Sequence, residues 1–180
     1  REGVYPIKEL FLNEKPIFNP NNFPRYALTL QHKGEMLTKV YSPNPEDKFK
    51  WINSIPLNVP FGTKNLNKDA PYSVTTKSVK DMIILKKFCP AVIASQNESR
   101  SAMSQNTMDN LFRLYPNNYI AWDVDDVGND AMDVMEELDF IPIRWYEKYY
   151  EDKSVKDYSD LAKEEGLQAV EQVLKDNGVI

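Results

Sequence analysis

The sequence predicts an α/β fold in which a parallel four-stranded sheet is flanked by helices and preceded by a small β-rich subdomain. From Tyr72 onward, short apolar runs alternate with helical segments, which is typical of βαβ units. Before that point, two apolar runs on either side of Lys33 and Gly34 indicate a β-hairpin. A third observation is an apolar run that stops on the carboxylates of Asp123 and Asp125, as a buried strand does where it enters a binding site.

The composition is that of a globular protein with one domain, or with one domain and a small satellite. The chain has 180 residues, of which 42% are hydrophobic and 27% charged, enough to bury a core. No apolar run approaches the roughly 20 residues of a membrane helix, and no signal peptide is evident, so we expect a soluble, cytoplasmic protein. The net charge of −5 argues against binding nucleic acid by bulk charge, so such binding requires local basic clusters.

The single cysteine and the single histidine are not expected to form a reactive site. Cys89 is the only cysteine, which excludes an internal disulfide and a cysteine-rich zinc site and fits a reducing compartment. It ends an apolar helix, so we expect it to be buried. His32 is the only histidine and lies at the predicted hairpin tip, where a surface role is expected. The chain begins with Arg1 rather than Met, and we expect it to be a piece of a longer protein.

The N-terminal part is predicted to be β-rich. An irregular lead-in, residues 1–24, is followed by hairpin strands at residues 26–30 and 36–41 and by an extended piece at residues 49–52. Prolines and a glycine then interrupt the pattern up to Pro71. We therefore expect two domains, residues 1–71 and 72–180.

The C-terminal part is predicted to contain the parallel sheet. The expected strands are residues 73–76, 91–95, 119–123 and 141–145, and the expected helices are residues 79–88, 105–114, 129–138, 161–165 and 167–175. Ligands of such sheets gather at the carboxyl ends of the strands, where Lys77, residues 95–98 and residues 123–126 fall.

The acidic pair has several interpretations. In an extended strand, side chains at i and i+2 share a face, so Asp123 and Asp125 could bind one cation such as Mg²⁺. A solvated acidic turn is an equally simple interpretation. A calcium loop is excluded, because Val127 and Val134 stand where oxygen ligands are needed. A haloacid-dehalogenase phosphatase site would need more strands than the remaining chain provides.

A second acidic segment, residues 156–160, precedes a predicted helix. Asp157 or Ser159 could simply cap that helix, with Asp160 near its positive end. Alternatively, carboxylates arriving at the same sheet edge would suit a two-cation site.

Five segments follow one another in the order and spacing of a known family: Lys77–Asp81 with Leu85, Ala91–Ser95, Leu111–Arg113, Trp122–Gly128 and Lys156–Asp160. They resemble the E-G-x-x-D-x-x-x-L, A-V-A-x-x-G-T, L-x-R-L, F-D-x-D-x-A-G and K-D-P-D-E motifs of bacterial and phage replicative primases. The catalytic core of that family is built around the TOPRIM domain, a Rossmann-like fold shared with type IA and type II topoisomerases. The resemblance extends from about residue 40 to about residue 175.

The primase branch is indicated by the stretch Lys50–Ser54, which resembles the family's K-Y-L-N-S, and by Phe61–Gly62, which resembles its Y-G-L. The resemblance implies that Lys50 and Asn53 face the nucleotide and template groove. Without it, the preferred interpretation of this stretch is an edge strand with an exposed lysine and a buried Trp51.

The resemblance implies a DNA primase that makes RNA primers on single-stranded DNA from ribonucleoside triphosphates by nucleotidyl transfer with Mg²⁺ or Mn²⁺. A replicative helicase is an expected partner through parts outside this chain, in the host cytoplasm if the protein is phage-encoded. The implied metal ligands are Asp123, Asp125, Asp157 and Asp160. The implied catalytic residues are Asp123, Asp125, Lys77 and Asp81. The implied nucleotide- and nucleic-acid-binding residues are Lys50, Asn53, Lys77 and Lys80.

The sequence departs from the family at the end of the first TOPRIM strand, where Lys77 replaces a glutamate. A lysine cannot ligate Mg²⁺, so Lys77 either contacts the triphosphate or marks a retired site. Ser159 stands at the second acid of the K-D-P-D-E motif, with Asp160 one residue later, and which of them approaches the metal stays open.

Two other functions stay open from the sequence. A TOPRIM nuclease would use the same acidic face to cleave a phosphodiester, and a non-catalytic nucleic-acid-binding module would need no chemistry. A basic track could be extended by Arg25, Lys48 and Lys64, although solvated surface residues are the preferred interpretation of Arg25 and Lys64.

Overall fold

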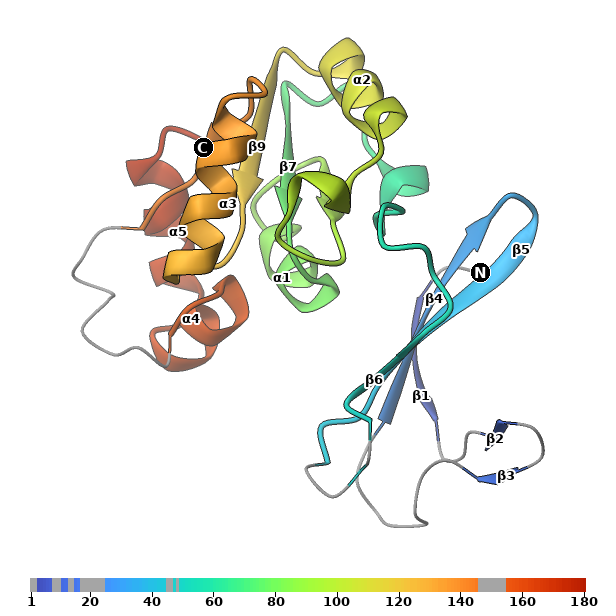
Figure 1. Cartoon of the computed structure of the whole chain (residues 1–180). Helices are drawn as coiled ribbons and strands as arrows, with labels where there is room; N and C mark the ends of the chain where they lie inside the picture. Colours follow the sequence, from blue (N-terminus) through green and yellow to red (C-terminus); the bar gives the residue numbers. More distant parts are fainter. Residues whose placement is uncertain are drawn as a thin grey trace. The chain divides into compact units, whose positions relative to one another are not determined.

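The computed structural model describes residues 3–7, 11–12, 15–16, 25–44, 47, 49–145 and 155–180. It divides into two compact units (Figure 1). Residues Arg1–Pro56 form the N-terminal unit, and residues Leu57–Ile180 form the C-terminal unit.

The N-terminal unit contains an antiparallel sheet with the strand order β1-β4-β5-β6. Its strands are β1 (Gly3–Ile7), β4 (Arg25–His32), β5 (Glu35–Tyr41) and β6 (Trp51–Asn53), and a separate short pair is formed by β2 (Phe11–Leu12) and β3 (Lys15–Pro16). The predicted hairpin is confirmed: His32 pairs with Glu35, and both turn residues have positive φ, 49° at Lys33 and 89° at Gly34. Two left-handed residues are what the right-handed twist of a tight hairpin requires.

Arg25 is a structural residue of the N-terminal unit and does not extend a basic track. It is buried, and its Nε and Nη2 each donate a hydrogen bond of 2.8 Å to the carboxylate of Asp47. Ser42 also donates to Asp47. The hydrogen bonds from Arg25 hold the pKa of Asp47 below its usual value. Lys64 is exposed, and Lys48 lies outside the described residues.

The C-terminal unit has the predicted parallel sheet, with the strand order β10-β9-β7-β8. Its elements are β7 (Tyr72–Thr76), α1 (Val79–Leu85), β8 (Val92–Ala94), α2 (Gln105–Leu114), β9 (Asn117–Ala121), α3 (Asp126–Glu136), β10 (Ile141–Pro142), α4 (Tyr158–Glu164) and α5 (Leu167–Asp176), with short 3₁₀ turns η1 (Thr63–Asn65) and η2 (Arg100–Ala102). The α/β fold class is therefore confirmed.

Helices α2 and α3 cover one face of this sheet. Each presents apolar residues at i and i+3, Met108 with Leu111 and Met132 with Met135, to a core cluster that includes Trp122. Full burial of side chains of this size contributes roughly 1.5–3 kcal/mol each. Helix α4 packs against both α1 and α5.

The C-terminal unit begins before the boundary that the sequence suggested after Pro71. Phe61 pairs with Ala94 in an antiparallel bridge, with N···O distances of 2.8 and 3.0 Å, and Ala70 belongs to the core cluster. The prolines and Gly62 in this stretch therefore shape a segment that packs on the sheet. The compact units divide at Pro56, whereas the domain boundary itself stays a prediction.

Hydrogen bonds tie the carboxyl ends of three neighbouring strands together. Trp122 Nε1 donates to Ser95 Oγ at 3.0 Å, and Ser95 Oγ lies 3.0 Å from the Thr76 carbonyl oxygen. Gly128, in the first turn of α3, lies so close to the end of β9 that a β-carbon there would stand 2.0 Å from the carbonyl oxygen of Asp123. These contacts hold the carboxyl ends of β7, β8 and β9 close to the start of α3. No helix in the described ranges is long and apolar enough to cross a membrane.

Candidate metal centre

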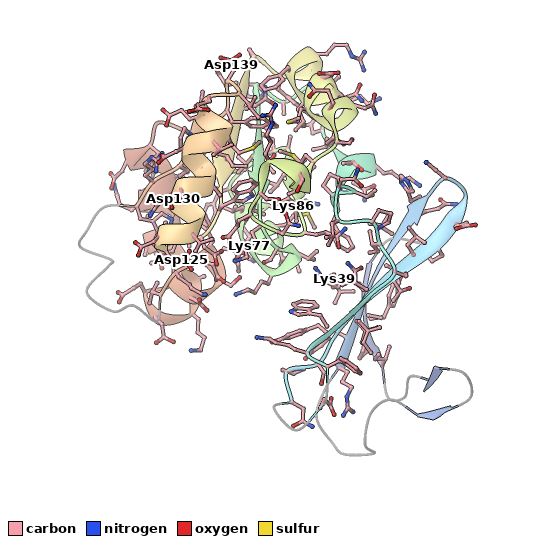
Figure 2. The ribbon with its side chains drawn as sticks, in the orientation of Figure 1. Lys39, Lys77, Lys86, Asp125, Asp130 and Asp139 are labelled. Atoms are coloured by element: carbon pink, nitrogen blue, oxygen red, sulfur yellow. The ribbon has the colours of Figure 1, made fainter. Side chains whose placement is uncertain are left out.

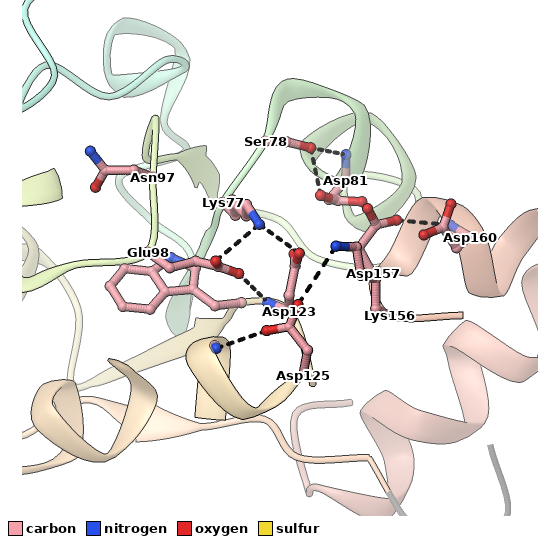
Figure 3. A network of polar contacts seen from close by, with 12 residues as sticks. Lys77, Ser78, Asp81, Asn97, Glu98, Asp123, Asp125, Lys156, Asp157 and Asp160 are labelled. Carbon is pink, nitrogen blue, oxygen red and sulfur yellow. Dashed lines mark hydrogen bonds and ion pairs between the residues drawn. The ribbon is translucent and has the colours of Figure 1, made fainter. Parts of the chain in front are cut away.

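Three buried aspartates meet at the carboxyl edge of the parallel sheet (Figure 3). Asp81 lies in the first turn of α1, Asp123 follows β9, and Asp157 precedes α4. Their exposed fractions are 1%, 2% and 6%, and one carboxylate oxygen of each lies within 4.8 Å of the others. We call these three residues the acidic cluster. Carboxylate oxygens at this spacing are the ligands that hard divalent cations prefer.

Asp81 connects the starts of α1 and α4. Its Oδ2 accepts a hydrogen bond from Ser78 Oγ at 2.5 Å, and its Oδ1 accepts from the backbone N and the Oγ of Ser159 at 3.0 and 2.5 Å. Burial, together with the charge of Asp157, raises the pKa of Asp81. Ser159 therefore supports the acidic cluster through Asp81.

Asp157 caps α4, as the structural interpretation of its segment predicted. Its Oδ1 accepts from the backbone N of Asp160 at 2.9 Å, and its Oδ2 accepts from Lys80 Nζ. A backbone hydrogen bond of 3.0 Å from Val124 N to the carbonyl of Lys156 brings this segment beside the end of β9. Capping the helix and facing Asp123 are thus compatible roles.

Asp160 lies at the margin of the cluster. Its Oδ1 is 4.0 Å from Lys80 Nζ, and its side chain is 34% exposed. Its role as a metal ligand stays a prediction.

Asp123 has one oxygen bonded and one without a partner. Its Oδ2 accepts from Lys77 Nζ at 2.6 Å, whereas Oδ1 is buried and has no hydrogen-bond partner among the described residues. Burial raises the pKa of Asp123 to about 7, the hydrogen bond from Lys77 opposes this, and the charges of Glu98 and Asp157 add to it. An unsatisfied buried carboxylate oxygen is costly, and a cation would remove that cost. The donor set therefore fits a divalent metal ion.

Lys77 joins Asp123 to Glu98, which the sequence placed at this edge of the sheet without assigning it a role. Its Nζ lies 2.6 Å from Asp123 Oδ2 and 2.9 Å from Glu98 Oε2. Burial lowers the pKa of Lys77, but the hydrogen bonds and charges of these two carboxylates outweigh it, so the net shift is upward. Glu98 belongs to no motif. Its position shortly after the carboxyl end of β8, next to β7 in the sheet, is the signal that placed it at this edge.

Asp125 does not share a strand face with Asp123. Strand β9 ends at Ala121, and Asp125 caps α3 by accepting a 3.0 Å hydrogen bond from Gly128 N. Its Oδ2 lies 3.6 Å from Lys156 Nζ, and its side chain is 40% exposed. Figure 2 shows Asp125 and Lys77 at the same end of the unit. Asp125 is not one of the three clustered carboxylates, and its role as a ligand stays a prediction.

The predicted nucleotide-binding residues Lys50 and Asn53 belong to the N-terminal unit. Lys50 is exposed, and Asn53 Oδ1 accepts a 2.9 Å hydrogen bond from Ile55 N. Trp51 is 45% exposed, contrary to the buried edge-strand interpretation. Its ring centroid lies 4.5 Å from that of Tyr41, and Lys39 Nζ lies 4.7 Å from the Trp51 ring centroid. The Trp51 ring is thus in contact with Tyr41 and Lys39 while it remains partly exposed.

No protein-family model matches the sequence, and neither does any curated protein. Solved structures do match. The Aquifex aeolicus primase (zinc-binding and RNA polymerase domains) matches with a TM-score of 0.63 and 19% identity, over 84% of this chain and 40% of that chain. The primase fragment of the bacteriophage T7 primase-helicase protein matches with a TM-score of 0.62 and 15% identity, over 84% and 63%.

A third match, with a TM-score of 0.61 and 12% identity, covers 89% of this chain and 80% of the other. It comes from a bacteriophage T7 structure in which lagging-strand DNA polymerase interacts with the primase domains of two gp4 subunits bound to an RNA/DNA hybrid and dTTP. This chain thus spans 40% of the matched Aquifex chain and 63% of the T7 fragment. Its structure has the fold of bacterial and phage primase fragments, as the five motifs predicted.

Proposed function

We propose that this chain is the catalytic core of a DNA primase, which joins ribonucleotides on a single-stranded DNA template with Mg²⁺ or Mn²⁺. The observation that supports it best is the acidic cluster with the unpartnered oxygen of Asp123, situated on a fold shared with primase fragments. Asp81, Asp123 and Asp157 would hold the cation. Bound there, the cation lowers the charge barrier between an attacking 3′-hydroxyl and a triphosphate and stabilises the pyrophosphate leaving group.

The side chains around the cluster supply charge and position. Lys80 is 54% exposed and paired with the buried carboxylate of Asp157, and its ammonium group can also contact a phosphate at the surface. Lys77 offers a second ammonium group beside Asp123. In the proposed function, Lys50 and Asn53 contact the template or the nucleotide, as the family resemblance implies. Little proton transfer by side chains is required, because positioning and charge neutralisation dominate phosphoryl chemistry.

The proposed partners are ribonucleoside triphosphates and single-stranded DNA. A replicative helicase is proposed as a further partner, because one matched structure is a fragment of a primase-helicase protein. That contact would be made by other parts of a longer protein. The proposed place of action is the cytoplasm, of a host cell if the protein is phage-encoded.

A second candidate is a non-catalytic nucleic-acid-binding module. The observation that favours it is the direct ion pair between Lys77 and Asp123, which places an ammonium group on an oxygen that a metal ion would otherwise use. The completeness of the acidic cluster supports the enzyme instead, since a retired site is not expected to keep three buried carboxylates at such a cost.

The decisive experiment is template-directed incorporation of labelled ribonucleotides on single-stranded DNA with Mg²⁺ or Mn²⁺, run beside a cleavage assay on the same DNA. The proposal expects synthesis that Asp123→Asn abolishes and that the exposed Asp130→Asn on α3 retains. Cleavage without synthesis would identify a nuclease. Metal and DNA binding with neither reaction would identify a non-catalytic module.

A further inference from the structure

The ammonium group of Lys77 is held inside the metal centre rather than beside it. Asp123 Oδ2 and Glu98 Oε2 contact Lys77 Nζ at 2.6 and 2.9 Å, and the Lys77 side chain is 31% exposed. Lys80 differs, because it pairs with Asp157 from the surface. Of these two lysines, Lys77 is held by two poorly exposed carboxylates, whereas the second carboxylate near Lys80, that of Asp160, is 4.0 Å away and 34% exposed.

A second hydrogen bond ties Glu98 to the backbone at the end of β9. Its Oε1 accepts a 3.0 Å hydrogen bond from the backbone N of Asp123, while its Oε2 holds Lys77 (Figure 3). The Glu98 side chain is only 9% exposed. Movement of Lys77 out of the site would leave the poorly solvated carboxylates of Asp123 and Glu98 without this cationic partner. A buried charge deprived of its partner is strongly destabilising.

Charge balance at this sheet edge leaves room for one divalent ion. Its four least exposed carboxylates are those of the acidic cluster and of Glu98. Two ammonium groups, from Lys77 and Lys80, face these four carboxylates, so two negative charges remain. One divalent cation neutralises them. A second would leave the same centre with two excess positive charges in a site of low solvation, whereas removal of Lys77 would reduce that excess to one.

The carboxylate oxygens that already accept hydrogen bonds also indicate a single metal ion. Lys77 takes Asp123 Oδ2, so the oxygen of Asp123 left for a metal ion is the unpartnered Oδ1. Two-metal sites use their ions as a pair that clamps the attacking and leaving oxygens of a displacement. An ammonium group can take the charge-neutralising share of that work, because it donates hydrogen bonds and attracts phosphate oxygens.

We propose that Lys77 is a built-in second cation of this centre, held in place by Glu98, so that the chain binds one divalent ion instead of two. This inference rests on the metal-dependent function proposed above. It assigns Glu98 a positioning role: Glu98 acts on the site by holding the Lys77 ammonium against Asp123.

The test is the number of Mn²⁺ ions bound per chain, counted by electron paramagnetic resonance of free Mn²⁺ after equilibrium dialysis. Wild type is expected to bind one ion. Lys77→Met is expected to bind two, because it opens Asp123 Oδ2 and removes one positive charge. The double variant Lys77→Met with Glu98→Gln is expected to return to one ion, because it restores the charge balance without an ammonium group. Lys175→Met, which breaks an ion pair on α5, is the control and should bind one.

Thermal unfolding distinguishes this role from a purely structural ion pair. Without metal, Lys77→Met should unfold at a lower temperature than wild type, and saturating Mn²⁺ should restore more stability to it than to wild type. A structural ion pair would lose stability that Mn²⁺ does not recover. If Lys77→Met fails to fold, Glu98→Gln serves instead. It should still bind one ion, with reduced affinity because one carboxylate charge is lost.

Several outcomes would overturn the inference: two ions bound by wild type, or one ion bound with unchanged affinity by Lys77→Met. Primer synthesis by a wild-type chain that binds two ions would reject the inference and leave the proposed function standing. One bound ion in wild type and two in Lys77→Met, without synthesis by wild type, would support the inference and reject the proposed function. Absence of Mn²⁺ binding would reject both.

Discussion

The two candidate binding regions differ in how their polar groups are held. At the edge of the parallel sheet, buried Asp81, Asp123 and Asp157 are surrounded by other charged and polar groups, and Asp123 Oδ1 has no hydrogen-bond partner within the part of the chain that the structure describes. On the antiparallel sheet, Lys50 and Trp51 are exposed and tolerate the absence of a ligand. A buried carboxylate is costly without a cation, whereas an exposed lysine is not. The structure alone therefore suggests metal binding by the first region, whereas nucleic-acid binding by the second rests on the resemblance to primases.

The largest expected effect comes from the unpartnered oxygen. Asp123→Asn should reduce Mn²⁺ affinity, measured by calorimetry, by more than the roughly 10- to 100-fold caused by losing a supporting residue. The fold should persist, because the substitution also removes a buried charge. Asp125→Asn is the matched comparison, since Asn still caps a helix well. If Asp125→Asn weakens binding as much as Asp123→Asn does, then Asp125 is a ligand, as its sequence spacing suggested.

The next largest effect should come from the close packing behind the acidic edge. Gly128→Ala would place a β-carbon 2.0 Å from the Asp123 carbonyl oxygen, so the start of α3 must shift. We expect a loss of about 1–3 kcal/mol in the free energy of unfolding, measured with urea, together with weaker Mn²⁺ binding. Asp130→Ala, at an exposed position of the same helix, should leave both unchanged. Equal stability of Gly128→Ala and wild type would show that the helix start adjusts without cost.

The buried edge should also respond to pH, unlike the exposed lysine region. The pKa of Asp123 is about 7 in the folded chain, against about 3.9 in an unfolded one. The stability that this group contributes is therefore full below about pH 4 and falls as pH rises toward 7, by up to about 1.4 kcal/mol per pH unit. Mn²⁺ replaces the proton, so its affinity should rise over the same window.

Thermal unfolding between pH 4 and 8, with a chelator and with Mn²⁺, measures this dependence. Asp123→Asn should lack the component that wild type shows in the chelator. If both proteins gave the same profile, the titrating group would be another residue.

Much of the fold could be predicted from the sequence, for reasons that differ between the elements. Strands β8 and β9 were predictable because they coincide with short apolar runs bounded by turn signals, and β7 because its Val74, Thr75 and Thr76 are β-branched. The hairpin was predictable from Lys33–Gly34. Strand β1 was not, because its pairing with β4 depends on the partner edge and not on its own pattern.

The candidate site was only partly predictable for a related reason. Asp81, Asp123 and Asp157 follow from motifs at strand and helix ends, and all three meet. The grouping of Asp123 with Asp125 assumed an extended backbone, whereas the chain begins capping α3 at Asp125. Glu98 follows β8 at the sheet edge where ligands were expected, but it belongs to no motif, so its pairing with Lys77 became apparent only in the folded structure. Motifs thus indicated the three clustered carboxylates and the lysines that pair with them, and the tertiary structure showed which of these groups meet.

The smallest expected effect belongs to the exposed region and tests whether it binds nucleic acid at all. Lys50→Ala should lower the affinity for single-stranded DNA and reduce the slope of log affinity against log salt by about one phosphate contact. Lys68→Ala, another exposed lysine outside the predicted groove, is the control and should preserve both quantities. Fluorescence anisotropy with a labelled oligonucleotide at several salt concentrations measures them together. An identical slope in Lys50→Ala and wild type would make Lys50 an ordinary surface lysine. Nucleic-acid binding would then have to come from other residues than the one that the primase resemblance singled out.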